Sequence, residues 1–373
     1  MKKRKGSKYN HNPSRQSSYT GFSSSYPGSS FGRRVSYSEK VRRRKILKVI
    51  SSAVGLIAVL TFGFFIVDFM LNVSELPVKT TGQETTLSSK TPVTTQTQPQ
   101  TQPVFISSDT KAFLIDKASL ASTSNMLTAI QEVKGNGGGA VIIDFKDSKG
   151  YLSYDSTLEE MQTVNADENH FDTVSECISL CKKEGIKVIA RIFCFKDPLA
   201  AGAFKGEYAI NYMGDVGMLW LDNSRENGGK PWLNPFSENA QKYLLGIIRE
   251  VCALNVDAVL LDTVQYPPVS LSKASFSGED TAGAPSRNEA LLNFIDKAVN
   301  ATKDTTLICM ADAQTVVNGY SKNYEGTIEN CASKVLAVDL RNTTLESEIA
   351  VRGKTIVPVL TTPSDSSPYF VMP

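Results

Sequence analysis

Four aspartates stand at the ends of short apolar runs, and one arginine lies inside another such run. The aspartates are Asp144, Asp262, Asp312 and Asp339, and the arginine is Arg191 in the run VIARIFCF. Runs of this length that are rich in Val, Ile and Leu are typical of buried parallel strands. Carboxylates at the carboxyl ends of such strands lie where α/β enzymes place their chemistry. The pattern therefore predicts a cluster of carboxylate side chains around the guanidinium group of Arg191.

Alternating strand and helix signals provide the elements that must position this cluster. Strands are expected over 112–116, 140–145, 187–195, 258–262, 306–311, 334–339 and 355–360, with helices over 123–134, 171–184, 237–254 and 287–302. Strands that alternate with helices form βα units around a parallel sheet. Seven units with long loops after the strands favour an α/β fold of the TIM-type barrel class over an open sheet. No clear eighth strand follows, so the eighth unit is expected to be incomplete.

The side-chain period of a strand then orients the charged residues. Helices cover the outer face of a barrel strand, and an unpaired guanidinium in that apolar layer would be costly. Arg191 is therefore expected to point into the barrel, toward the aspartates at its mouth. Each aspartate taken alone could equally accept backbone hydrogen bonds and cap the loop that follows it. Four of them together with an inward arginine favour a functional site.

The chain before this domain divides into three segments. Residues 1–48 are rich in Ser, Gly, Tyr, Lys and Arg, and we expect them to be disordered because they contain too few apolar side chains. Residues 49–71 begin with an uncharged apolar run long enough to span a bilayer as a single transmembrane helix. Residues 72–104 have the Thr, Gln and Pro composition of a linker. The globular barrel domain is expected over 105–373.

The charge is distributed unevenly about the apolar run. Residues 1–48 hold 14 of the 40 basic side chains and one of the 38 acidic ones, although the whole chain carries a net charge of only +2. The basic cluster VRRRKILK directly precedes the apolar run. The positive-inside rule therefore predicts a single-pass cell-membrane protein with a cytoplasmic N-terminus and an extracellular barrel. Anionic membrane lipid is the expected partner of the basic segment, and nucleic acid is not.

The cysteine, histidine and aromatic residues further limit the kinds of site that the chain could contain. The chain has six cysteines, which we expect to be mostly free and buried, and its two histidines are His11 and His170. No cluster with zinc-ligand spacing exists, so neither a metal nor an organic cofactor is expected. Both tryptophans, Trp220 and Trp232, fall in the loop after the third strand. They could close over a minor core or stack on the apolar face of a sugar, and the two interpretations are equally supported.

Several stretches are similar to one known family. They are AVIIDFKDSKGYLSYDS, GIKVIARIFCFKDP, WLNPFSENAQKYLLGIIREVCALNVDAVLLDTVQYP and ICMADA. Together they resemble the glycoside hydrolase domain of the DUF4015 type, a TIM-barrel group of bacterial surface proteins, over residues 113–360. The resemblance implies a catalytic acid at Asp262 and assigns the strand-five motif S-A-D to Ala311 and Asp312. The candidate substrate-binding residues are Arg191, Lys146, Asp197, Trp220, Trp232, Gln265 and Tyr266.

The first hypothesis is an extracellular glycoside hydrolase that acts on a cell-wall or surface polysaccharide. Glycosidic cleavage needs two carboxyl groups, one ionised and one held protonated. Asp262 is expected to be the nucleophile or base and Asp312 the acid, with Asp339 in reserve. Arg191 and Lys146 would keep Asp262 and Asp144 ionised.

The second hypothesis is a barrel that binds glycans, or acts as an envelope scaffold, without catalysis. It rests on two departures from the family pattern. The strand-four motif F-D-Y-V-R-F-P is replaced by LDTVQYP, which puts Thr263 and Gln265 where the family has an aromatic residue and an arginine. The strand-six motif S-P-M-x-Y-P is replaced by AVDLRN. The two hypotheses differ in whether Asp262 faces a second carboxyl group across an open cleft.

Overall fold

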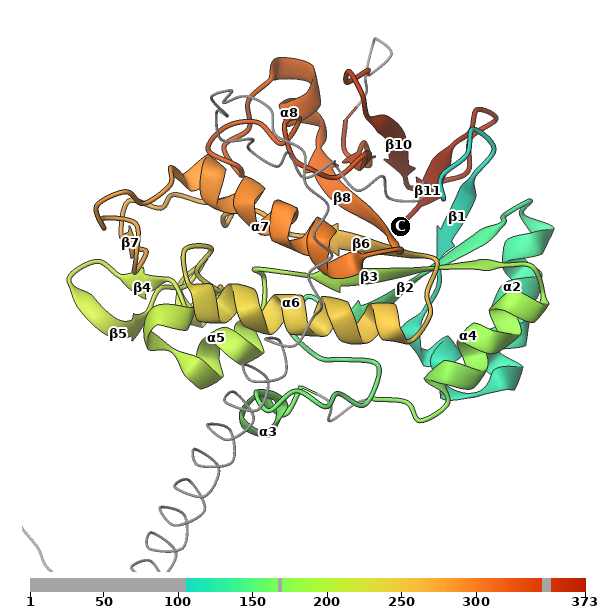
Figure 1. Cartoon of the computed structure of the whole chain (residues 1–373), viewed down its shortest axis with the longest axis horizontal. Helices are drawn as coiled ribbons and strands as arrows, with labels where there is room; N and C mark the ends of the chain where they lie inside the picture. The colour runs from blue at the N-terminus through green and yellow to red at the C-terminus, as the bar shows by residue number, and fades with distance from the viewer. Residues whose placement is uncertain (1–104, 167–169, 344–349) are drawn as a thin grey trace, which may run out of the picture. The chain divides into compact units, whose positions relative to one another are not determined.

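The computed structural model describes residues 105–166, 170–343 and 350–373. These residues form a closed barrel of parallel strands in the order β1, β2, β3, β6, β8, β9, β10 and β11, and β11 pairs with β1 (Figure 1). The predicted TIM-type barrel is thereby confirmed. The segments expected over 1–48, 49–71 and 72–104 lie outside the described residues. Within the described ranges, no helix is both long enough and apolar enough to cross a membrane.

The elements keep the order that the sequence pattern predicts. The barrel strands are β1 Lys111–Leu114, β2 Ala140–Lys146, β3 Lys187–Phe193, β6 Ala258–Asp262, β8 Thr306–Asp312, β9 Val335–Asp339, β10 Thr355–Leu360 and β11 Tyr369–Val371. The α-helices are α2 Thr123–Gly135, α3 Met161–Val164, α4 Val174–Lys183, α5 Pro198–Phe204, α6 Glu238–Ala253, α7 Arg287–Thr302 and α8 Ala313–Asn318. Short 3-10 helices are η1 Lys117–Ala121, η2 Gly206–Tyr208 and η3 Arg225–Asn227.

An eighth strand closes the barrel, which corrects the expectation of an incomplete eighth unit. Strand β11 has three residues, Tyr369–Val371, and pairs in parallel with β10 on one side and β1 on the other. All three of its side chains are buried. The strand follows a Ser- and Pro-rich segment that ends at Pro368, so its apolar run is too short to stand out as a strand signal.

Alternate side chains of each strand fill the barrel and cover its outside. The interior cluster contains Ile142, Ile189, Leu260 and Met310, whereas their sequence neighbours join the core beneath the helices. Successive side chains of a strand point to opposite faces, so residues two positions further along share the inward direction. By this alternation, five charged residues at the carboxyl ends of the strands face inward: Asp144, Arg191, Asp262, Asp312 and Asp339.

Helices α2, α4, α6 and α7 cover part of the outside of this barrel (Figure 1). Three of them begin at a serine that caps the helix: Ser122 caps α2, Ser237 caps α6, and Ser286 forms a reciprocal capping box with Glu289 at α7. Their apolar faces pack on the outward side chains of the strands. Among the described residues, β9, β10 and β11 are not followed or preceded by a helix of comparable length.

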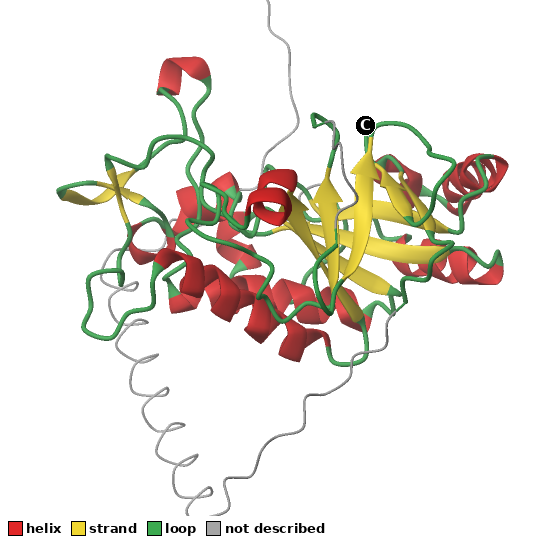
Figure 2. Ribbon diagram, turned by 90° about the horizontal axis from the view of Figure 1, so that it is seen from above, coloured by secondary structure: helices red, strands yellow, loops and turns green. Residues whose placement is uncertain are grey.

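The loops after β3 and β6 build a small second sheet that the sequence does not predict. It consists of β4 Asn211–Tyr212, β5 Asp215–Leu219 and β7 Ala274–Ser275, in the order β5-β4-β7. Figure 2 shows these three strands apart from the strands of the barrel. Since the two loops leave the carboxyl ends of β3 and β6, the small sheet is tethered to the strands that carry Arg191 and Asp262.

Candidate functional site at the barrel mouth

Arg191 joins two of the strand-end carboxylates at the barrel mouth. Its Nε lies 2.5 Å and its Nη2 2.9 Å from the two carboxylate oxygens of Asp144, which is a two-point ion pair. Its Nη1 lies 3.8 Å from Oδ2 of Asp262. The Arg191 side chain is 8% exposed, and it packs over the ring of Phe193. The inward direction predicted for Arg191 is therefore observed, and the arginine holds Asp144 more tightly than Asp262.

Of the two carboxylates beside Arg191, Asp262 is the one that remains available to a ligand. Within the described part of the chain, no side chain donates a hydrogen bond to it, and its side chain is 13% exposed. Burial raises the pKa of Asp262 above its usual 3.8, and the charge of Asp144 acts in the same direction. Arg191, the backbone N–H of Thr263 and Arg341 oppose this rise in the pKa without cancelling it. Asp262 is thus a carboxyl group biased toward its protonated form at the edge of solvent.

The residue after Asp262 has a backbone conformation that branched residues avoid. Thr263 has φ +52°, in the left-handed region that is costly for a side chain branched at Cβ. The residue that follows β3 supports this conformation, because the Cys194 N–H donates to the carbonyl of Asp262 and to Oγ1 of Thr263. Backbone strain of this kind is concentrated at functional sites. Here the conformation of Thr263 sets the direction in which the chain continues after the end of β6.

Arg341 is a second cation at the mouth that sequence reasoning missed. It follows β9, and its Nε and Nη2 lie 2.8 Å and 2.7 Å from the two oxygens of Asp339. Burial alone would raise the pKa of Asp339, but the hydrogen bonds and charge of Arg341 outweigh burial and lower it. Arg341 also acts electrostatically on Asp262. The signal in the sequence is the pair of residues two apart, Asp339 and Arg341, at the end of a strand.

Asp312 also lies at the mouth, but both oxygens of its carboxylate accept hydrogen bonds from other residues of the protein. One oxygen accepts from the backbone N–H of Thr315 at 2.8 Å, which caps α8. The other accepts from Ser321 Oγ at 2.5 Å and from Asn323 Nδ2 at 3.1 Å. The capping role that any strand-end aspartate could have is therefore the role that Asp312 has in this structure.

Lys146 and Asp197 form a buried ion pair away from the mouth. Lys146 Nζ lies 2.9 Å from Asp197 Oδ2, and both side chains are fully buried. Asp197 also accepts from Tyr243 Oη at 3.1 Å and from the N–H of Ala200, which caps α5. Neither residue can contact a substrate in this position, although both were candidates for substrate binding.

A bulge explains why Lys146 leaves the barrel interior. The register between β2 and β3 shifts between Asp144 and Lys146, and Lys146 pairs with Ile192, an outward residue. A bulge inserts an extra residue and redirects the side chains beyond it. Strict alternation would have placed Lys146 inward beside Asp144, so the sequence pattern alone could not find its true position.

The aromatic candidates are mostly buried. Tyr266 is fully buried and donates its hydroxyl to the carbonyl of Arg287. Trp232 is 2% exposed and donates its indole N–H to Asp222 at 2.9 Å. Trp220 is 5% exposed and lines a hollow beside the small sheet. Gln265 is half-buried just beyond Asp262. The structure therefore places both tryptophans in the accessory loops, and no hydrogen bond joins Gln265 to the charged residues of the mouth among the described residues.

Thiols and metal-ligating groups contribute nothing further to this site. The six cysteines are free; Cys252 is half-buried and the other five are buried. Burial is the main reason that the pKa of Cys181 rises to about 12. In the described ranges, no group of three or more His, Cys, Asp or Glu side chains is arranged to hold a metal ion.

The barrel and its carboxylate-lined mouth are the architecture of many α/β-barrel enzymes. The sequence matches the family described as "Putative glycosyl hydrolase domain", DUF4015, over residues 112–335. The chain belongs to this family, as the resemblance of its strand motifs implied. None of the curated proteins compared with the chain matches it significantly.

Several solved structures are similar to parts of the chain at low sequence identity and low TM-score. A hypothetical protein from Ruminiclostridium thermocellum is 21% identical with a TM-score of 0.45, over 53% of this chain and 96% of that one. A GH20 exo beta-N-acetylglucosaminidase from Vibrio harveyi is 14% identical with a TM-score of 0.46, over 68% of this chain and 41% of that enzyme. An alpha-galactosidase from Thermus thermophilus is 11% identical with a TM-score of 0.36, over 57% of this chain and 39% of that enzyme. The chain thus spans less than half of the length of either enzyme.

Proposed function

We propose that the protein is a glycoside hydrolase that cleaves a cell-wall or surface polysaccharide at the barrel mouth, with Asp262 as its central catalytic residue. One observation carries the proposal: Asp262 is a largely buried carboxyl group with a raised pKa, Arg191 and Arg341 both act on it electrostatically, and no side chain of the described residues donates a hydrogen bond to it. Membership of the family supports the reaction class. The choice of a cell-wall or surface polysaccharide as the substrate is part of this proposal.

The electrostatics favour Asp262 as the general acid rather than the base expected from its sequence position. A glycosidase needs two carboxyl groups whose environments move their pKa values apart. Burial raises the pKa of Asp262, whereas Arg341 lowers that of Asp339. Asp262 would donate its proton to the glycosidic oxygen as the bond to the anomeric carbon breaks. Asp339 would remain ionised and either attack that carbon or take a proton from the water that attacks it.

The other charged residues of the mouth would position rather than react. A carboxylate offers about four acceptor sites, so Asp339 keeps capacity for a substrate or a water molecule while it is paired with Arg341. Arg191, held by Asp144, would carry its remaining guanidinium N–H groups to sugar hydroxyls beside Asp262. Asp312 is assigned a structural role, because its carboxylate caps α8 and holds Ser321 and Asn323 in place.

The alternative function, glycan binding without catalysis, is favoured by a specific observation. In the structure, Arg191 and Arg341 are each held by a two-point ion pair, so Asp144 and Asp339 are both engaged. Of the inward carboxyl groups, Asp262 is therefore the one that is not already held by a two-point ion pair or by capping hydrogen bonds among the described residues. One available carboxyl group is sufficient to bind a sugar hydroxyl, whereas hydrolysis needs Asp339 or Asp144 to act while paired.

The pH dependence of hydrolysis distinguishes these roles. Activity should fall as the pH rises through the raised pKa of Asp262, because the acid loses its proton. It should fall again only in strong acid, where Asp339, whose pKa is below 3.8, becomes protonated. Reducing-end release by the full-length chain on a glycan panel from pH 3 to pH 8 should therefore show an acidic optimum. A rate that increases steadily toward pH 8 would contradict the assignment of Asp262 as acid.

We further propose that residues 49–71 anchor the protein in the cell membrane with the barrel outside. The support is the uncharged apolar run and the basic cluster before it. Protease added to intact cells should remove the chain beyond Leu71 and spare residues 1–45. Protection of the barrel from the protease would place it on the cytoplasmic side and exclude this topology.

A further inference from the structure

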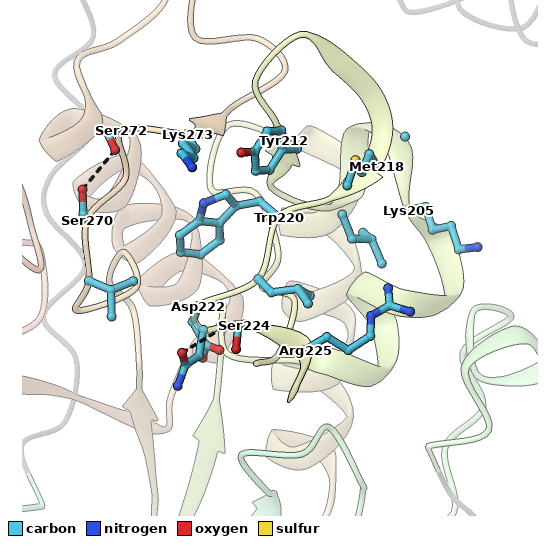
Figure 3. Close-up of a pocket in the computed structure, with 15 residues that line it drawn as sticks. Lys205, Tyr212, Met218, Trp220, Asp222, Ser224, Arg225, Ser270, Ser272 and Lys273 are labelled. Atoms are coloured by element: carbon cyan, nitrogen blue, oxygen red, sulfur yellow. Dashed lines mark hydrogen bonds between the residues drawn. The ribbon is translucent and has the colours of Figure 1, made fainter. Parts of the chain in front are cut away.

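A hollow lies between the small sheet and the loop that follows β6, outside the catalytic cluster. Its volume is about 850 Å³, within the range of roughly 300–1,000 Å³ that is usual for ligand sites. The segment 217–225 forms one side, and Val269, Ser270, Ser272 and Lys273 form another. Figure 3 shows the indole of Trp220 in the middle, with Lys273 on one side and Lys205 and Arg225 on the other.

The hollow has an excess of positive charge. Lys205, Arg225 and Lys273 line it and are exposed, and none of them forms an ion pair with a carboxylate of the described residues. The acidic side chain in the lining is Asp222, and its oxygens accept from the backbone N–H of Lys230 and from the indole of Trp232. The three cations outnumber the single carboxylate, so the lining keeps a net positive charge that can meet an anionic ligand.

The rest of the lining suits a sugar. Trp220 and Tyr212 provide aromatic surface, and the hydroxyls of Ser224, Ser270 and Ser272 can donate to and accept from sugar hydroxyls. Ser270 and Ser272 are exposed and hydrogen-bond each other at 3.2 Å, so each keeps further capacity for a ligand. The two loops that build the hollow leave the ends of β3 and β6, which carry Arg191 and Asp262.

We propose that this hollow is a second binding site, which holds an anionic stretch of a polysaccharide through Lys205, Arg225 and Lys273. The recognised group is a carboxylate or a phosphate ester on the glycan, since both present oxygens that these cations can bind. The site concerns binding and is independent of whether Asp262 is catalytic. It would bring a charged polysaccharide to the protein, from which the chain could continue to the barrel mouth.

Intrinsic fluorescence can test the site, because both tryptophans of the chain lie in the loop that forms it. The purified full-length chain is titrated with polygalacturonate, which carries carboxylates, with polyglycerol phosphate, and with neutral amylose. At least one polyanion should bind and should bind better than amylose, with an affinity that falls as salt is added. Whichever polyanion binds more tightly identifies the anionic group.

Two matched triple variants make the test specific. Lys205→Gln, Arg225→Gln and Lys273→Gln together should weaken polyanion binding about tenfold, since three exposed charge contacts are removed. Lys182→Gln, Lys183→Gln and Lys242→Gln remove the same charge from exposed positions of α4 and α6 and should leave binding unchanged.

Four results would overturn the proposal. They are no binding of either polyanion, equal binding of amylose, equal weakening by both triple variants, and binding only to vesicles that contain phosphatidylglycerol. If the Lys205, Arg225 and Lys273 triple variant also loses that vesicle binding, the last result would assign these three cations to the membrane surface rather than to a glycan.

Discussion

Replacing Asp262 with asparagine is expected to reduce glycan hydrolysis about 10³-fold, the effect typical of removing a general acid. The change keeps the shape of the side chain and removes the proton that Asp262 would donate. Stability should remain unchanged or increase, because burial disfavours the ionised form of this carboxyl group. Reducing-end release and the melting temperature of the purified full-length variant measure the two effects separately.

Asp312→Asn is the matched control for this prediction. The substitution has the same chemistry, at the end of β8 instead of β6, but Asp312 accepts hydrogen bonds from Ser321, Asn323 and the start of α8. It should cost about 1–2 kcal/mol of stability and affect the rate far less than Asp262→Asn. Similar rate losses in both variants, each with a lower melting temperature, would show that Asp262 is only a structural residue.

The stability difference at Asp262 should depend on pH with a defined sign. Its pKa is raised in the folded state, so the protonated carboxyl is favoured and the stability it contributes is complete below the unfolded pKa. That contribution is lost as the pH rises through the folded pKa. The stabilisation by Asp262→Asn should therefore be present at pH 7 and vanish below about pH 3.8, where both states are protonated.

The Lys146→Met variant is expected to lose about 3–5 kcal/mol of stability. Lys146 and Asp197 are both fully buried, and removal of the ammonium leaves the carboxylate of Asp197 without its countercharge. A loss of this size should lower the melting temperature by about 10 °C in a domain of this length. Thermal unfolding followed by circular dichroism measures it.

Two further variants show whether the loss comes from an unpaired buried charge. Lys146→Met combined with Asp197→Asn removes both charges and should recover most of the stability, because Asn can still cap α5. Lys117→Met breaks an ion pair with Asp147 whose side chains are 29% and 17% exposed, and it should cost at most about 1 kcal/mol. Equal losses from Lys146→Met and Lys117→Met would contradict the account of the buried pair.

The barrel could be predicted from the sequence because each of its longer strands is marked by a pattern within a few consecutive residues. Apolar runs such as AVIIDF and AVLLD mark single buried strands, and the period of two along VIARIF places Arg191 inward without any tertiary information. The eighth strand was missed because three residues give no periodic signal. Its assignment depends on pairing with β1, which is distant in the sequence.

The candidate site was predicted only in part, because hydrogen-bond partners are not local. Asp262 and Asp312 look alike in sequence, but the loop 321–323 folds back onto Asp312 alone. The bulge in β2 sends Lys146 outward, and strict alternation cannot anticipate it. Arg341 was overlooked because it lies two residues beyond its strand, and only the structure shows that it holds Asp339.

The most direct test of the central claim is a crystal structure of the Asp262→Asn variant soaked with an oligosaccharide of a polysaccharide that the wild type cleaves. The variant should leave the sugar intact at the barrel mouth. The account predicts that a glycosidic oxygen lies about 3 Å from the amide at position 262, within hydrogen-bond reach of the group that replaces the acid. A sugar that is bound elsewhere on the protein, with position 262 and Arg191 untouched, would contradict it.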